Sequence, residues 1–200
     1  MLYQESLFAE EPTISHINGL IYIPNFINPA EETSLLNTID KHPWLNDLKR
    51  RVQHYGWKYD YTARRVDASM QLGLLPEWLA DYCQRLYNEG YFPKLPDQVI
   101  INEYQPGQGI APHIDCVPCF EEIIASLSIG SPCVMKFTHP VTGEKTSRLL
   151  EPCSLLIFSG EARHQWKHSI ASRKTDKYGS QIIHRDRRIS LTFRNMIINS

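Results

Sequence analysis

The sequence predicts an α+β fold in which N-terminal helices pack outside an antiparallel β core. Two observations support this prediction. Residues 76–89 place apolar side chains at helical spacing, as the positions of Leu79, Cys83 and Leu86 show. From residue 97 onward, short β-rich runs alternate with Pro, Gly and Asn, which is typical of an antiparallel sandwich or barrel. We therefore expect the helices to cover a double-stranded β core.

The first elements along the chain are a strand and a helix. Residues 19–27 predict a strand that runs into a turn. Asn28 follows as a helix cap, with Pro29 in the first turn and two acidic residues after it, and the helix should continue to about His42.

The middle of the chain is less regular than its flanks. Residues 50–66 mix β-forming, aromatic and arginine side chains around Gly56, which is typical of a hairpin or flap. After the helix over residues 76–89, six runs predict the strands of the core: QVIINEY, EIIASLSIG, CVMKF, SRLL, SLLIFSG and RRISLTFR. No repeat or linker divides the chain, so we expect one domain over residues 1–200, with residues 1–15 flexible.

Composition restricts the class of protein. The chain has 200 residues, 42% of them hydrophobic, and a net charge of −1, which fits one soluble domain, expected to be a monomer. No apolar run approaches the roughly 20 residues that span a bilayer, and the acidic start is unlike a signal peptide. Five cysteines, an odd number, favour a reduced compartment. We expect a cytoplasmic or nuclear protein with no membrane contact.

The triplet His113-Ile114-Asp115 is the main chemical motif. Residues two apart on a strand point the same way, so His113 and Asp115 can share one metal ion. Two imidazoles and one carboxylate leave open positions, as in non-haem Fe(II) oxygenases, and suit an open catalytic site better than a closed structural zinc site. Spacing alone does not choose among the histidines available as the third ligand, which are His139, His164, His168 and His184.

A second motif predicts an acidic ligand. Arg188 and Arg194 are six apart, so on a strand they face the same side as Ser190, while the alternate residues, which are apolar, face the other side. A buried guanidinium is costly unless it meets an anion, and its planar fork matches a carboxylate. Asn102 and Tyr104 repeat this arrangement on an earlier strand. We expect a dicarboxylate ligand; the alternative is an exposed strand with arginines in water.

The strings INEYQPGQGIAPHID, SLSIGSPCVMKF, WKHSI and RRISLTFR, taken in this order, resemble the AlkB family of Fe(II)/2-oxoglutarate dioxygenases. The resemblance covers nearly the whole chain. The segments RRVQHYGWKYDY, SLSIGS and SGEARHQWKHSI are most similar to the AlkB domain of the eukaryotic tRNA wobble-uridine hydroxylases, here expected as a stand-alone domain without their RNA-recognition and methyltransferase parts. The resemblance implies a double-stranded β-helix (jelly-roll) core, Fe(II), 2-oxoglutarate as co-substrate, and O2.

The resemblance also implies roles for individual residues. The iron ligands would be His113, Asp115 and His168. The residues that hold 2-oxoglutarate would be Asn102, Tyr104, Arg188, Ser190 and Arg194, with Arg188 at the distal carboxylate and Arg194 near the end that chelates iron. Ser190 departs from the family, which often has Asn at this position.

The flap over residues 50–66 is the predicted site of substrate recognition. Its basic and aromatic side chains suit phosphate contacts and the stacking of an extruded base. The predicted substrate-binding residues are Arg50, Arg51, His54, Tyr55, Trp57 and Tyr59. The alternative is a hairpin with its aromatic side chains in the core and its charges in water.

These observations lead to one main hypothesis and two alternatives. The main hypothesis is oxidative demethylation of alkylated nucleobases in DNA or RNA. The first alternative is hydroxylation of a modified tRNA wobble uridine. The second is of another class, either an oxygenase acting on protein or lipid, or a binding protein that has lost catalysis.

Two short motifs stand apart from the catalytic pattern. Cys116 and Cys119 form a CxxC directly after the metal motif, and we interpret them as a pair of free thiols because a zinc site would need two more ligands. The peptide QESLF, residues 4–8 from Gln4 to Phe8, is similar to peptides that dock bacterial DNA-repair proteins on the sliding clamp.

Overall fold

The computed structural model describes residues 17–46 and 48–198. Their strands form a six-stranded sheet, a four-stranded sheet and a separate hairpin, with antiparallel pairing throughout. The larger sheet contains, in spatial order, β1 (Leu20–Ile23), β8 (Ser154–Phe158), β5 (Ile124–Gly130), β12 (Arg188–Arg194), β3 (Gln98–Tyr104) and β2 (Arg51–Tyr55). The smaller sheet contains β4 (Ile110–His113), β9 (Lys167–Ile170), β6 (Cys133–Thr138) and β7 (Lys145–Leu150), and the hairpin is β10 (Thr175–Tyr178) with β11 (Gln181–His184).

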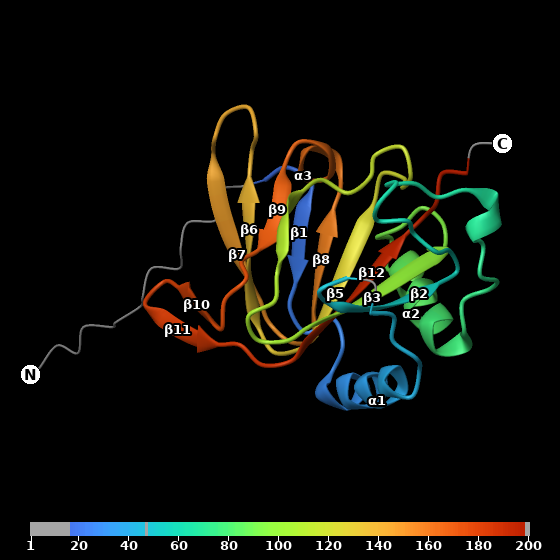
Figure 1. Cartoon of the computed structure of the whole chain (residues 1–200), viewed down its shortest axis with the longest axis horizontal. Coiled ribbons are helices and arrows are strands. Elements are labelled where there is room, and N and C mark those ends of the chain that lie inside the picture. Colours follow the sequence, from blue (N-terminus) through green and yellow to red (C-terminus); the bar gives the residue numbers. More distant parts are fainter. Residues whose placement is uncertain (1–16, 47, 199–200) are drawn as a thin grey trace, which may run out of the picture.

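Both faces of the larger sheet are covered. Alternate residues of β12, such as Leu191 and Phe193, pack with α1 (Pro29–Asp40) and α2 (Glu77–Asn88) in one apolar core. On the other face, Phe158 packs against Phe137 of the smaller sheet, with ring centroids 6.2 Å apart, in a second core. Figure 1 shows the two sheets and the helices outside them. The predicted α+β jelly-roll with N-terminal helices outside is confirmed.

Local signals explain the first helix. The Asn28 side chain accepts hydrogen bonds from the backbone of Ala30 and Glu31, both at 2.9 Å, and the Glu31 carboxylate accepts one from the Asn28 backbone at 2.7 Å. This is a capping box, which satisfies amide groups that the first turn leaves free. The helix then presents Leu35 and Ile39 to the core.

Of the hairpin or flap expected over residues 50–66, no hairpin forms around Gly56. β2 is instead the edge strand of the larger sheet and pairs with β3. Gly56 has a φ of +76°, and a Cβ atom built there would lie 1.9 Å from the carbonyl oxygen of Asp97, so the chain turns where only glycine fits. Beyond it come isolated bridges, including Trp57 to Gln71, and a single 3-10 turn, η1 (Ala68–Met70).

Two further points complete the fold. A short helix, α3 (Gly160–His164), comes between β8 and β9. Within the described ranges, no helix is long and apolar enough to cross a membrane. The clamp-like peptide at residues 4–8 and the segment 1–15 lie outside the described residues.

Candidate active site

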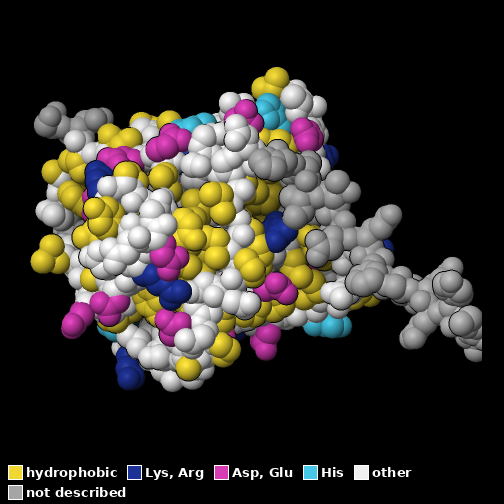
Figure 2. Space-filling view, turned by 180° about the vertical axis from the view of Figure 1, so that it is seen from behind, with side chains coloured by type: hydrophobic (Ala, Val, Ile, Leu, Met, Phe, Trp, Pro, Cys, Tyr) yellow, Lys and Arg dark blue, Asp and Glu magenta, His cyan; other side chains and the backbone are white. Residues whose placement is uncertain are grey.

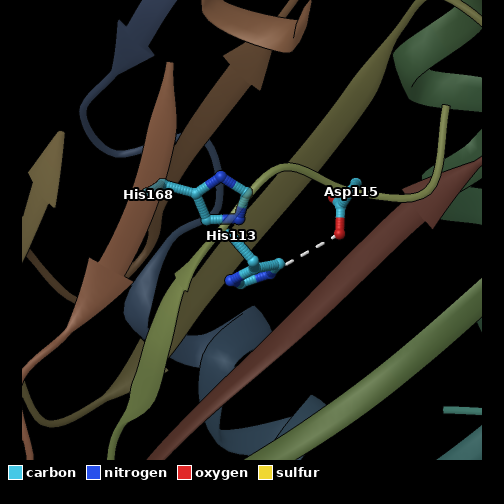
Figure 3. Close-up of side chains that lie close together, drawn as sticks. All are labelled: His113, Asp115 and His168. Atoms are coloured by element: carbon cyan, nitrogen blue, oxygen red, sulfur yellow. Dashed lines mark ion pairs between the residues drawn. The ribbon is translucent and has the colours of Figure 1, made fainter. Parts of the chain in front are cut away.

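The structure brings His113, Asp115 and His168 together (Figure 3). His113 ends β4 and lies opposite His168 in the antiparallel pair of β4 with β9. The ligand atoms of the three side chains all lie within 4.8 Å of one another. The sequence predicted Asp115 on the same strand as His113. In the structure, Asp115 lies in the loop that follows β4. Its carboxylate nevertheless reaches the histidines, with Oδ1 3.7 Å from His113 Nε2.

The backbone fixes the His113 ring. Nδ1 lies 2.8 Å from the carbonyl oxygen of Ala111. A carbonyl oxygen only accepts, so Nδ1 carries a proton, and Nε2, which faces Asp115, is the ring atom available to a metal. Outer hydrogen bonds of this kind orient histidine ligands in metal sites. The ring is therefore prepared to bind a metal through Nε2.

Burial and charge set the protonation of the other two ligands. Burial lowers the pKa of His168 to about 4, against the opposing effect of Asp115, so the imidazole is neutral near pH 7. Burial alone would raise the pKa of Asp115, but the positive charges around it, foremost that of Arg194, hold the pKa well below its usual range. The site thus offers a neutral imidazole and an ionised carboxylate, the forms that bind metal.

The other histidines considered as third ligand lie elsewhere. His164 pairs with Glu122 at 2.7 Å, and His139 contacts Gln165. His184 is exposed on β11. Among the described residues, none of these three belongs to the cluster.

A pocket of about 330 Å³ opens beside the three ligands. Its walls come from both sheets, and all five residues predicted to hold 2-oxoglutarate line it: Asn102, Tyr104, Arg188, Ser190 and Arg194. The register explains why, because Arg188 pairs with Tyr104 and Ser190 with Asn102 on the same face of the sheet. The predicted co-substrate residues therefore lie together.

Arg188 is the clearest indication of an anionic ligand. Its side chain is 3% exposed, and among the described residues no carboxylate lies within 4.0 Å of its guanidinium. Nη2 donates to the hydroxyl of Ser128 at 2.8 Å, whereas Nε is buried without a partner. A buried guanidinium with free donors favours binding of a carboxylate.

Arg194 and Asn102 lie in the same pocket. Arg194 Nη2 is 3.3 Å from the Asp115 carboxylate, and its buried Nε also lacks a partner. Asn102 Oδ1 accepts a hydrogen bond from Arg50 Nε at 2.8 Å, which leaves the Asn102 amide nitrogen free to donate elsewhere. The donor set fits a dicarboxylate, and the His113, Asp115 and His168 set fits Fe(II).

The six predicted substrate-binding residues do not all line the pocket. Arg50 and Tyr59 line the pocket. Arg51 instead binds Glu103 at 2.5 and 2.7 Å on the helix-facing side, and Tyr55 packs 5.4 Å from the Trp78 ring. The prediction that Arg51 and Tyr55 bind substrate is therefore wrong. Side chains alternate between the two faces of a strand, and these two are on the face of β2 that looks toward the helices.

The other two members of that set are close to the pocket but not in its wall. His54 contacts the Tyr61 ring at 5.7 Å, and Trp57 packs against the second core. The pocket wall contains Tyr61 and Arg64 instead. Arg50 lies between two tyrosines, 5.6 Å from the Tyr61 ring and 5.7 Å from that of Tyr104.

The structure also corrects the interpretation of the CxxC motif. Cys116 and Cys119 are joined by a disulfide rather than left as free thiols. A turn explains the pairing, since the Cys119 amide donates to the Cys116 carbonyl at 3.2 Å and the Cα atoms lie 5.3 Å apart, within disulfide range. Both side chains are buried next to the metal ligands.

Comparison with known proteins identifies the family. A family model described as the 2OG-Fe(II) oxygenase superfamily matches residues 19–194. The chain belongs to this superfamily. Membership implies Fe(II), 2-oxoglutarate and O2, in agreement with the His-Asp-His cluster, and it makes the chain a dioxygenase.

Relatives of this 2OG-Fe(II) oxygenase come from the AlkB family, as the sequence resemblance predicted. An Arabidopsis thaliana protein named "Alkylated DNA repair protein ALKBH8 homolog" is 38% identical over 90% of the chain. A Xenopus tropicalis protein named "tRNA (carboxymethyluridine(34)-5-O)-methyltransferase alkbh8" is 40% identical over 79% of it. The chain spans 59% of the plant protein and 26% of the frog protein.

A solved structure supports the fold of this oxygenase. The structure of OsALKBH1 superposes with a TM-score of 0.63 at 17% identity, covering 91% of this chain and 99% of that one. At this identity the likeness concerns the jelly-roll fold alone.

Proposed function

We propose that this 2OG-Fe(II) oxygenase acts on nucleobases in DNA or RNA and that its main reaction is oxidative removal of N-methyl groups. The observation that carries the proposal is the pocket itself. The cluster of His113, Asp115 and His168 borders a cavity of about 330 Å³ whose wall also contains Tyr59 and Tyr61. Aromatic side chains beside a reactive centre suit a flat base taken out of its stack.

The residues of the pocket have separate tasks in this proposal. The two histidines and Asp115 would hold the iron, and Arg188, Arg194, Asn102, Tyr104 and Ser190 would hold 2-oxoglutarate. When bound, iron and 2-oxoglutarate would supply, together with O2, the chemistry that hydroxylates a C–H bond while 2-oxoglutarate is converted to succinate and CO2. A hydroxylated N-methyl group leaves as formaldehyde, whereas a hydroxyl on an ordinary carbon remains. The same site therefore serves demethylation or hydroxylation.

The protein side chains also orient the reactants and exclude water. Arg188 offers its unpartnered donors to one carboxylate of 2-oxoglutarate in a buried position. Apolar residues such as Ile110, Met135 and Phe158 line the same cavity and keep it dry around the reacting centre.

We propose that nucleic acid approaches at the pocket mouth. Arg64, which is exposed, lines the pocket and donates to the carbonyl of Ile114 at 3.3 Å, and Arg65 is exposed next to it. Figure 2 shows the face behind that of Figure 1, where acidic and basic side chains are interspersed among hydrophobic ones. The described residues of that back face form no continuous basic surface, so the back face is less suited than the pocket mouth to binding a phosphate backbone.

Hydroxylation of a modified tRNA wobble uridine is the second candidate reaction. It is favoured by the 40% identity to the frog protein whose name refers to carboxymethyluridine 34. Because the chain spans only 26% of that protein, the likeness concerns one of its parts. The reactions differ in product, since demethylation releases formaldehyde and hydroxylation adds one oxygen atom.

One experiment separates these possibilities. The protein is incubated with Fe(II), 2-oxoglutarate and either methylated oligonucleotides or bulk tRNA, and the nucleosides are analysed by mass spectrometry. Loss of 1-methyladenine or 3-methylcytosine supports demethylation. A gain of one oxygen on a wobble uridine supports the second candidate. No change in either pool, while 2-oxoglutarate is still consumed, would contradict a nucleic-acid substrate and point to protein or lipid.

A further inference from the structure

Arg163 is a buried cation that takes no part in the pocket wall. Its side chain lies in α3, is 2% exposed, and has no carboxylate within 4.0 Å among the described residues. Burial lowers the pKa of its guanidinium. Such a costly position requires acceptors for its donors. Nη1 and Nη2 meet backbone carbonyls that all belong to one loop, whereas Nε is buried without a partner among the described residues.

That loop carries a metal ligand. Arg163 Nη1 donates to the carbonyl of Asp115 at 3.0 Å, and Nη2 donates to those of Cys116 and Phe120, both at 3.3 Å. Asp115 lies beyond the end of β4, so no strand pairing fixes its backbone. The guanidinium therefore supplies hydrogen bonds that a sheet would otherwise provide.

The helix that carries Arg163 is itself firmly held. The Ala162 amide donates to the carbonyl of Asn18 at 3.0 Å, and the Gly160 amide donates to the Glu122 carboxylate at 2.7 Å. Four residues after α3 comes His168, on β9. One side chain thus connects the loop of one metal ligand to the segment that leads to another.

We propose that Arg163 is a positioning residue of the metal site, which holds Asp115 at the correct place relative to His168 without touching the metal. The proposal rests on the assignment of His113, Asp115 and His168 as ligands and is independent of the substrate.

The test measures binding of Co(II), used as a spectroscopic probe in place of Fe(II), by the full-length protein. We expect Arg163→Met to weaken Co(II) binding by about 10- to 100-fold, the usual effect of removing an outer partner of a metal ligand. The visible absorption of bound Co(II) should also change, because the carboxylate no longer holds its place. Arg163→Lys keeps the positive charge but not the planar guanidinium with its several donors, so this variant should lose less Co(II) affinity than Arg163→Met.

The control is Gln53→Met. Gln53 is 3% exposed and donates to the carbonyls of Ile39 and His42 at 3.0 and 3.1 Å, so it makes contacts of the same kind on the helix-facing side of the sheet. This variant should lose stability but keep the affinity and spectrum of Co(II).

Three results overturn the proposal. The first is wild-type Co(II) affinity and spectrum in Arg163→Met, or in Arg163→Lys if the former does not fold. The second is an equal loss of affinity in Gln53→Met. The third is failure of both Arg163 variants to fold while Gln53→Met folds, which would make the residue purely structural. His113→Ala, measured in parallel, tests the ligand assignment separately.

Discussion

At the scale of single residues, two neighbouring arginines where β12 begins have different tasks. Arg187 faces the helices, where it binds the Asp40 and Glu103 carboxylates. Arg188 faces the pocket, where its guanidinium donates to the Ser128 hydroxyl and lies 5.5 Å from the ring of Tyr104. Burial of a charge without a counterion destabilises a fold. The fold therefore holds Arg188 at a cost that an anionic ligand would offset.

Replacing Arg188 separates binding from stability. We expect Arg188→Met to weaken 2-oxoglutarate binding about 10- to 100-fold, since hydrogen bonds to a charged group contribute roughly 1.5–3 kcal/mol. Without ligand, its melting temperature should stay the same or rise, because a buried unpaired charge is removed. Calorimetry with 2-oxoglutarate and Mn(II), together with thermal unfolding, measures both quantities.

The adjacent residue supplies the control for that experiment. Arg187→Met should lower the melting temperature, because it leaves the Glu103 carboxylate, buried on the helix-facing side, with one arginine fewer. Its affinity for 2-oxoglutarate should be unchanged. Equal affinity in Arg188→Met and wild type would contradict the assigned role of Arg188.

At the scale of elements, β2 shows why the sequence could not fully predict the substrate residues. The sequence shows the mixture of basic and aromatic residues over 50–66, but it does not show the register in which the strand pairs. Pairing with β3 directs Arg51 and Tyr55 to the helices, while the chain after Gly56 returns Tyr59 and Tyr61 to the pocket. A shift of one residue exchanges the two faces of a strand, and composition alone does not set it.

Substrate stacking can be tested at Tyr61. Tyr61→Ala should lower affinity for single-stranded nucleic acid by about 1–3 kcal/mol, the usual worth of one base stacked on an aromatic ring. Tyr87→Ala is the matched control, because Tyr87 is 44% exposed on α2 and does not line the pocket. Fluorescence anisotropy with a labelled oligonucleotide measures the difference. The same affinity in both variants would remove Tyr61 from the substrate site.

The hairpin of β10 and β11 depends on one buried carboxylate. Asp176 accepts hydrogen bonds from the Val134 amide at 3.0 Å and from Arg173 and Arg185 at 2.6 to 2.9 Å. Burial alone would raise the pKa of Asp176, but these hydrogen bonds outweigh it and lower the pKa. The ionised carboxylate thus ties the hairpin to β6.

This arrangement predicts acid sensitivity. Because the pKa of Asp176 is lower in the folded than in the unfolded chain, its stabilisation is complete above the unfolded value of about 3.9 and is lost as the pH falls through the folded one. Asp176→Asn should cost about 3–5 kcal/mol at neutral pH, as for a broken buried ion pair. The variant should also lose less stability than wild type below about pH 4. Urea unfolding at several pH values measures this, and parallel curves for the two proteins would contradict it.

At the scale of the whole molecule, the sequence predicted the jelly-roll and the set of site residues. It predicted less well the loops and long-range contacts that hold these residues in place. In strands such as 98–104 and 188–194, apolar core residues alternate with the polar residues of the pocket. This alternation made the role of each set predictable from the sequence. The placement of Asp115 in a loop, the short helix α3 and the link from Arg163 were not visible. They depend on contacts between segments far apart in the sequence, which local patterns do not record.

The central claim is that His113, Asp115 and His168 form the iron site of a 2-oxoglutarate-dependent oxygenase. The most direct measurement is succinate formation from 2-oxoglutarate with Fe(II) in air. We expect turnover by the wild type and by His164→Ala, since His164 pairs with Glu122 away from the cluster. His113→Ala should form no succinate. Unchanged turnover in His113→Ala, or its absence in the wild type, would contradict the claim.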